Sequence, residues 1–152
     1  MTQAAGGQCE EVCRNRGALT EAWTNMEVEE ETHVNTRGQR LSYTVLHPSK
    51  RQAHGLLVFH HGLTEHSRRH WHVLEEFVKQ LDLVVVTYDA HGHGKSEPLN
   101  SEDRAYVEDY RHFRDDLLQI VDEVAIPTAA KHGAPPGRVY LAGHSIGGKC
   151  TF

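Results

Sequence analysis

The stretch that most constrains what this chain can fold into is residues 143–148, Gly-His-Ser-Ile-Gly-Gly. Residues 138–142, Arg-Val-Tyr-Leu-Ala, come directly before it and have the β-prone, apolar character of a short strand. A strand that meets G-x-S-x-G and turns into a helix is typical of a nucleophile elbow, which holds a serine hydroxyl above a sheet. In this interpretation Gly143 and Gly147 are small because a side chain there would clash with neighbouring backbone. By itself the pattern also fits an ordinary glycine-rich turn, so other motifs in the chain are needed to distinguish the two interpretations.

Composition limits the class of protein. With 152 residues, 38% of them hydrophobic and 24% charged, the chain suits one domain with a packed core. Its formal charge of −5 gives no reason to expect nucleic-acid binding. No apolar run approaches the ~18 residues of a membrane helix, and the first residues lack the pattern of a signal peptide. Three cysteines, at positions 9, 13 and 150, form no disulfide framework. We therefore expect a soluble, cytoplasmic protein.

The first part of the chain predicts a tail and a hairpin. Residues 1–25 are polar and aperiodic, which favours a disordered tail in which two cysteines are incidental. From Val28 to Val34, and again from Leu41 to Val45, apolar and polar residues alternate. Residues 35–39 supply a turn between these runs, so we predict an antiparallel hairpin at a sheet edge that ends at Pro48.

The remainder alternates between strands and helices. Three apolar runs predict buried strands, and two segments with apolar residues three and four apart predict helices; the strands are 55–60, 83–88 and 139–142, and the helices 69–81 and 106–126. This order predicts an α/β fold, a mostly parallel sheet with helices on both faces. Sites in such sheets form at the carboxyl ends of the strands. His61-Gly62, the loop 89–94 and Ser145 would meet there.

Other chemistries fit less well. Gly94-Lys95-Ser96 resembles the end of a phosphate-binding loop, but Asp89 stands where that motif needs glycine. Gly92-x-Gly94 opens like a dinucleotide fingerprint, but Glu97 occupies the third glycine position. The 13 histidines form no recognisable zinc pattern. We therefore predict no metal and no cofactor.

Three motifs together identify a family resemblance. His61-Gly62-Leu63-Thr64-Glu65-His66-Ser67, the segment 88–96 and the elbow 143–148 resemble the α/β-hydrolase superfamily. More narrowly, they are similar to its monoacylglycerol lipase and lysophospholipase-like branch, with a serine aminopeptidase S33-type hydrolase domain. The resemblance covers residues 27–152, and its motifs occur in the order and at the strand ends that the superfamily uses.

The resemblance implies a role for each matching residue. Ser145 would be the nucleophile, and the backbone amides of Leu63 and Ile146 would form the oxyanion hole. His61 and Gly62 would shape the oxyanion loop, although an ordinary loop histidine is the alternative for His61. Residues 92–94 would hold a tight loop near the site and take no part in the chemistry.

The chain departs from the family after the serine. The superfamily order is Ser, then Asp or Glu, then His, and the residues from Ile146 to Phe152 contain neither an acid nor a histidine. His144 is adjacent to the serine, but at such a turn its side chain would point away from the hydroxyl. We therefore expect residues 26–152 to be the N-terminal half of a hydrolase domain, truncated after the elbow.

Two functions remain open at this stage. The first is a serine hydrolase of carboxylic esters, with monoacylglycerols or lysophospholipids as the substrates that the resemblance favours. The second is a catalytically inactive fragment, or an interaction protein, with the same fold. The first implies a small lipid or ester substrate, no nucleic acid, and peripheral membrane contact as an option for a complete enzyme. No partner protein can be identified.

Overall fold

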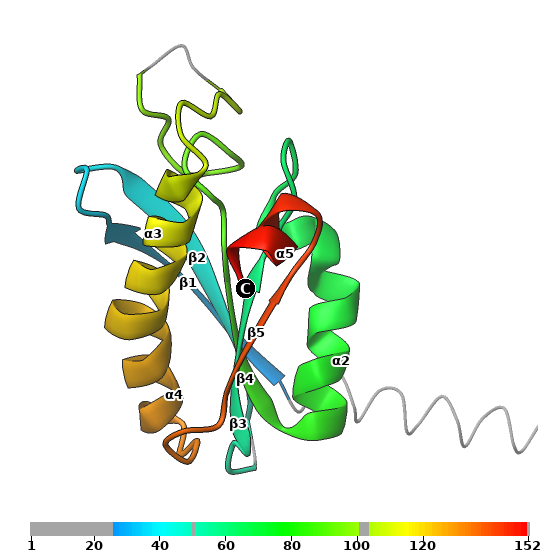
Figure 1. The fold of residues 1–152 in the computed structure, drawn as a ribbon. Coiled ribbons are helices and arrows are strands. Elements are labelled where there is room, and N and C mark those ends of the chain that lie inside the picture. Colours follow the sequence, from blue (N-terminus) through cyan, green and yellow to red (C-terminus); the bar gives the residue numbers. More distant parts are fainter. Residues whose placement is uncertain (1–25, 50, 101–103, 152) are drawn as a thin grey trace, which may run out of the picture.

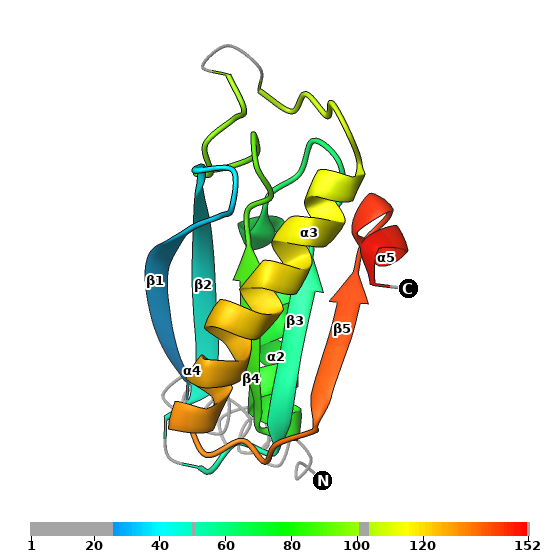
Figure 2. The ribbon, with the colours of Figure 1, turned by 60° about the vertical axis from the view of Figure 1, so that its left-hand side comes forward.

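The structure is a computed structural model that describes residues 26–49, 51–100 and 104–151. Its centre is a five-stranded sheet in the order β1-β2-β4-β3-β5 (Figures 1 and 2). The strands are β1 Met26–Val34, β2 Arg40–Pro48, β3 Gly55–His60, β4 Leu83–Tyr88 and β5 Val139–Gly143. β2 pairs antiparallel with both β1 and β4, whereas β3 runs parallel to β4 and β5. The predicted α/β fold is confirmed, with a mixed sheet.

Helices cover both faces of the sheet, as the sequence predicts. The helical elements are the 3₁₀ helix η1 Ser67–His70, α2 Trp71–Leu81, α3 Arg111–Gln119, the π-helical η2 Ile120–Ala125, α4 Ile126–Lys131 and the short α5 Ile146–Cys150. Figure 1 shows α2 on one side of the sheet and the continuous α3-η2-α4 rod on the other. No helix in the described part of the chain is long and apolar enough to cross a membrane.

The two core layers follow from the alternation of side chains along each strand. Leu56 and Val58 of β3 face the α3 side, where they join Phe113 and Leu117. Leu57 lies between them in sequence and faces the other side, where it packs with Leu74 and Val78 of α2. A strand with two apolar faces requires a cover on each side, and the helices provide it.

The long helix is displaced from its predicted position. The sequence predicted a helix over 106–126, whereas the observed one runs from Arg111 to Lys131. Tyr106 and Tyr110 are exposed and lie before its first turn. The predicted end near Pro127 is wrong because the preceding segment is π-helical. There the Ile126 N–H donates to the Val121 carbonyl, five residues back, and the wider turn accommodates a proline that has no N–H to donate.

β5 is not the buried strand that its composition predicted. Val139, Tyr140 and Leu141 are 38%, 53% and 39% exposed. β5 pairs with β3 on one side, and the described residues place no strand on its other side. It is therefore an apolar edge strand with unpaired backbone groups.

The predicted edge hairpin is confirmed. β1 and β2 pair along their whole length, and Gly38 turns between them at φ +81. Buried Asp116 of α3 holds this turn in place, because it accepts hydrogen bonds from Asn35 and Arg37 and contacts the His91 ring. The predicted disordered tail, residues 1–25, lies outside the described residues, as do Cys9 and Cys13.

Candidate active site

Ser145 occupies a strained turn between β5 and α5. Its φ of 56 and ψ of −117 lie outside the regions that non-glycine residues prefer. The residue is exposed, and it directly precedes Ile146, the first residue of α5. A strained, exposed serine between a parallel strand and a helix is the geometry of a nucleophile elbow.

The flanking glycines are required by close backbone contacts. A Cβ on Gly143 would lie 2.3 Å from the Gly147 carbonyl carbon, and one on Gly147 would lie 2.2 Å from the His60 carbonyl oxygen. Both neighbours are backbone atoms, so a side chain at either position would force the backbone to shift. This agrees with the steric reason for which the sequence predicted glycine at both positions.

The loop after β3 lies beside the elbow. β3 and β5 are parallel neighbours in which His60 pairs with Gly143, so both strands end at the same edge. The His144 N–H donates to the His60 carbonyl at 3.0 Å. A Cβ on Gly62 would come within 3.0 Å of His144 Nδ1. The predicted adjacency of the two loops is therefore present.

Glu65 connects the two loops, a role that sequence reasoning missed. Its Oε2 accepts the Gly62 N–H at 3.0 Å and lies 2.9 Å from His70 Nε2 and 3.0 Å from His144 Nδ1. These contacts, led by the one with His70, lower the pKa of the Glu65 carboxyl to about 2. The signal was present in the H-G-x-x-E-H-S motif, but nothing in the sequence showed that Glu65 reaches His144.

His61 is buried and fixes the loop. Its Nδ1 lies 2.7 Å from the Gly62 carbonyl, and its Nε2 accepts the Ala90 N–H at 2.9 Å. These partners require a neutral ring with the proton on Nδ1. Burial lowers the pKa of His61 to about 4, which keeps the ring neutral near pH 7. His61 therefore ties the loop after β3 to the loop after β4.

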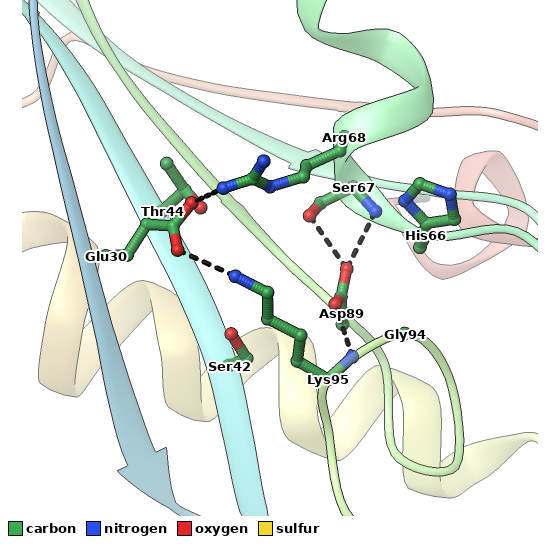
Figure 3. A pocket seen from close by; sticks show the side chains of 9 residues that line it. All are labelled: Glu30, Ser42, Thr44, His66, Ser67, Arg68, Asp89, Gly94 and Lys95. Atoms are coloured by element: carbon green, nitrogen blue, oxygen red, sulfur yellow. Dashed lines mark hydrogen bonds and ion pairs between the residues drawn. The ribbon is translucent and has the colours of Figure 1, made fainter.

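The loop after β4 is held by Asp89, as Figure 3 shows. The buried carboxylate accepts hydrogen bonds from the Ser67 N–H and hydroxyl and from the Lys95 N–H. A Cβ on Gly94, at φ +48, would lie 2.0 Å from Asp89 Oδ2, so this position requires glycine. Glu30 closes the rim of the small cavity beyond, through ion pairs with Lys95 and Arg68. This loop is a scaffold, consistent with the structural role expected for residues 92–94.

The predicted oxyanion donors lie on the two adjacent loops. Leu63 follows Gly62 and is 44% exposed. Ile146 begins α5, where a backbone N–H has no partner within its own helix. Across the described residues, neither amide donates a hydrogen bond to the protein. Both donors therefore remain available to a ligand.

No general base accompanies Ser145 in the described part of the chain. The Ser145 hydroxyl makes no hydrogen bond to any described residue, and the adjacent His144 ring contacts Glu65 instead. An open cavity of about 640 Å³ adjoins the serine and is lined by Tyr110, Ile146, Lys149 and Cys150. Burial raises the pKa of the Cys150 thiol, which makes it a poor nucleophile. The described site thus holds a strained, exposed serine, two backbone amides without a protein acceptor, and an open approach.

Comparison with known proteins decides the family. The family model described as serine aminopeptidase, S33, matches residues 51–152, which include all three motifs. The chain belongs to this α/β-hydrolase family.

Two curated lipases are similar in sequence to most of this chain. Monoglyceride lipase of Rattus norvegicus is 35% identical over 119 residues, which are 78% of this chain and 35% of that protein. Monoacylglycerol lipase of Mycolicibacterium smegmatis is 32% identical over 123 residues, covering 81% of this chain and 40% of that protein. The chain thus spans little more than a third of these curated relatives.

A solved structure shows the same fold. Est1E from Butyrivibrio proteoclasticus, solved with ferulic acid bound, superposes with a TM-score of 0.61 at 24% identity. The match covers 79% of this chain and 44% of that one.

Proposed function

We propose that this chain carries the nucleophile-bearing half of a serine hydrolase of carboxylic esters, with Ser145 as the nucleophile. The observation that carries the proposal is the strained elbow, with an exposed serine whose flanking glycines admit no Cβ. Membership of the S33 hydrolase family supports it.

The chemistry would proceed through an acyl-enzyme. The Ser145 oxygen attacks the acyl carbonyl carbon, and the ester carbonyl oxygen becomes an oxyanion. The amides of Leu63 and Ile146 donate to that oxyanion, a contribution that is often worth several kcal/mol in such sites. The alcohol leaves, and water then releases the acid from the serine. A base must take the hydroxyl proton, and an acid must orient that base; we infer that both lie beyond Phe152 in the complete enzyme.

Monoacylglycerols or lysophospholipids are the substrates that we propose. The similarity to monoglyceride lipases supports a lipid ester with one acyl chain. Tyr110, Ile146 and Cys150 add apolar surface around the serine, which would suit the start of an acyl chain.

The alternative is a catalytically inactive fragment or an interaction protein with this fold. Its support is the lack of any base next to Ser145 among the described residues. The transcript separates the two functions: an open frame past the Phe152 codon that encodes an acid and then a histidine favours the hydrolase, and a stop codon there favours the alternative.

The enzymatic test uses the longest polypeptide that the transcript encodes. We expect hydrolysis of 1-oleoylglycerol to fall by at least about 10³-fold in Ser145→Ala. Ser42→Ala, which removes a hydroxyl from β2 away from the elbow, should retain wild-type turnover. Equal activity in Ser145→Ala and wild type would refute the assignment of the nucleophile. Hydrolysis of short esters but not of 1-oleoylglycerol or lysophosphatidylcholine would refute only the lipid substrate.

A further inference from the structure

We propose that Glu29, His47 and His132 form a binding site for a zinc-type divalent cation, at the end of the sheet away from Ser145. Glu29 lies in β1, His47 lies in β2, and His132 is the residue that directly follows α4. One ligand atom from each lies within 4.8 Å of those of the other two.

The site is separate from the elbow. Tyr43 pairs with Tyr88 at the carboxyl end of β4, whereas Leu46 pairs with Val85 towards its start. His47 therefore lies near the amino ends of the parallel strands, and Ser145 follows the carboxyl end of β5. Figure 2 shows α4 reaching the same end of the sheet as the end of β2.

The strongest evidence is an unsatisfied nitrogen on His47. This side chain is 5% exposed, and its Nδ1 lies 3.3 Å from the Pro48 carbonyl, a contact that favours the tautomer with the proton on Nδ1. Its Nε2 is buried and has no hydrogen-bond partner among the described residues. Ligating histidines usually donate their other ring N–H to a carbonyl or carboxylate, which fixes the tautomer and orients the ring. His47 is thus oriented as a metal ligand would be.

Two carboxylates face the Nε2 atom of His47, an arrangement that favours a bound cation. Glu29 Oε1 lies 3.4 Å from His47 Nε2, and Glu27 Oε2 lies 3.9 Å away. With its proton on Nδ1, the His47 imidazole would point the Nε2 lone pair at two carboxylates, which repels. A metal ion placed between them would be bound by the imidazole and the Glu29 carboxylate together.

His132 supplies the third ligand. Its ring stacks on that of His47 with centroids 3.7 Å apart and planes 25° apart. Zinc–nitrogen bonds of about 2.0–2.1 Å require the ligand atoms to converge, so the His132 ring must tilt out of the stack. His132 lies just after α4 and is partly exposed, so its ring has room to tilt.

The ligand set indicates the class of metal. Two imidazoles and one carboxylate suit zinc and similar transition metals, with water or Glu27 in the fourth position. Glu29 is 48% exposed, which gives an ion a path of entry. The sequence predicted no metal because the three ligands come from distant segments and form no spacing motif.

A second group of ligand type, Glu65, His70 and His144, does not share this feature. The Glu65 Oε2 there already accepts the Gly62 N–H and faces both imidazoles at hydrogen-bond distance. The two imidazole nitrogens that face Glu65 are therefore both within hydrogen-bond distance of its carboxylate, unlike the buried Nε2 of His47.

Titration of the metal-free 152-residue chain with Co²⁺ tests the proposal. We expect one equivalent to bind with the visible absorption of tetrahedral Co²⁺, and Zn²⁺ to displace it. His132→Gln and Glu29→Gln should each weaken binding by at least about tenfold. His72→Gln, which removes an exposed histidine of α2, should bind as the wild type does. Circular dichroism of each variant checks folding, because His132 and Glu29 are partly exposed and their replacement should leave the fold intact.

Three outcomes would overturn the proposal. The first is no tetrahedral Co²⁺ spectrum, which would mean that a proton alone occupies the space beside His47. The second is unchanged affinity in folded His132→Gln and Glu29→Gln. The third is a thiolate charge-transfer band with full loss of binding in a Cys9→Ser, Cys13→Ser variant, which would assign the ion to those cysteines.

Discussion

Replacing Gly147 by alanine should destabilise the elbow far more than the same change at Gly148. Gly147 is the buried residue of α5 and lies against the end of β3. The added methyl group would lie 2.2 Å from the His60 carbonyl oxygen and 2.7 Å from that of His61. At Gly148 the nearest atom would be the Gly143 carbonyl oxygen, at 3.2 Å. The two changes are chemically identical and differ only in these contacts.

The magnitude follows from the overlap. A Cβ atom essentially never comes within 3.0 Å of a non-bonded heavy atom in real structures, so the short helix has to move away from the sheet. Overpacking of this kind costs about 3 kcal/mol where backbone has to shift. Alanine's helix preference over glycine offsets about 1 kcal/mol. Gly147→Ala should therefore lose about 2 kcal/mol, which lowers Tm by about 6 °C for a chain of this length. Gly148→Ala should change Tm by no more than about 3 °C, since its mild contact opposes the same helix preference.

Thermal unfolding of the two variants, followed by circular dichroism, measures the difference. Labelling of Ser145 by a fluorophosphonate probe in the longest encoded polypeptide reports the site itself, and it should slow in Gly147→Ala but not in Gly148→Ala. Equal melting temperatures for the two variants would show that α5 does not sit against the end of β3. The reasoning on the elbow would then fail.

Two further predictions concern stability and self-association. Burial lowers the pKa values of His60 and His61 from 6.5 to about 4, so the unfolded chain binds protons before the folded chain does as the pH falls from 6.5 to 4. Each histidine should therefore lower the free energy of unfolding by about 3 kcal/mol over that window. Urea midpoints that do not change between pH 7 and pH 4.5 would contradict this. The apolar edge of β5 should make the 152-residue chain self-associate. Leu141→Lys, at a residue that is 39% exposed, should shift the chain towards monomer in gel filtration, whereas the control variant His72→Lys in α2 should not. A monodisperse wild-type monomer would show that the β5 edge does not drive self-association.

The parallel strands could be predicted closely from the sequence. β3 and β4 occupy residues 55–60 and 83–88, the ranges that their apolar runs predicted. Both faces of these strands are buried, so an unbroken apolar run is what their environment requires. The elbow was also predictable, because the spacing of its serine and glycines is a local sequence pattern, even though Gly147 contacts the distant His60. For the same reason α2 matched its predicted range, apart from a first turn that is 3₁₀.

Other features depend on contacts that no local pattern encodes. The helix 111–131 continues past Pro127 because π-helical geometry removes the expected hydrogen bond. The exposure of β5 depends on whether another strand pairs with its free edge, whereas its apolar composition indicates only that it could be a buried strand. Glu65 and the group formed by Glu29, His47 and His132 join distant segments, so only the folded chain brings their side chains together.

The central claim is that Ser145 is the nucleophile of an ester hydrolase. The most direct test treats the longest polypeptide that the transcript encodes with a fluorophosphonate and locates the adduct by mass spectrometry. We predict a single modified residue, Ser145, with labelling that 1-oleoylglycerol slows and that prior heat denaturation abolishes. An adduct on another serine, or none on a folded polypeptide that still hydrolyses 1-oleoylglycerol, would contradict the account.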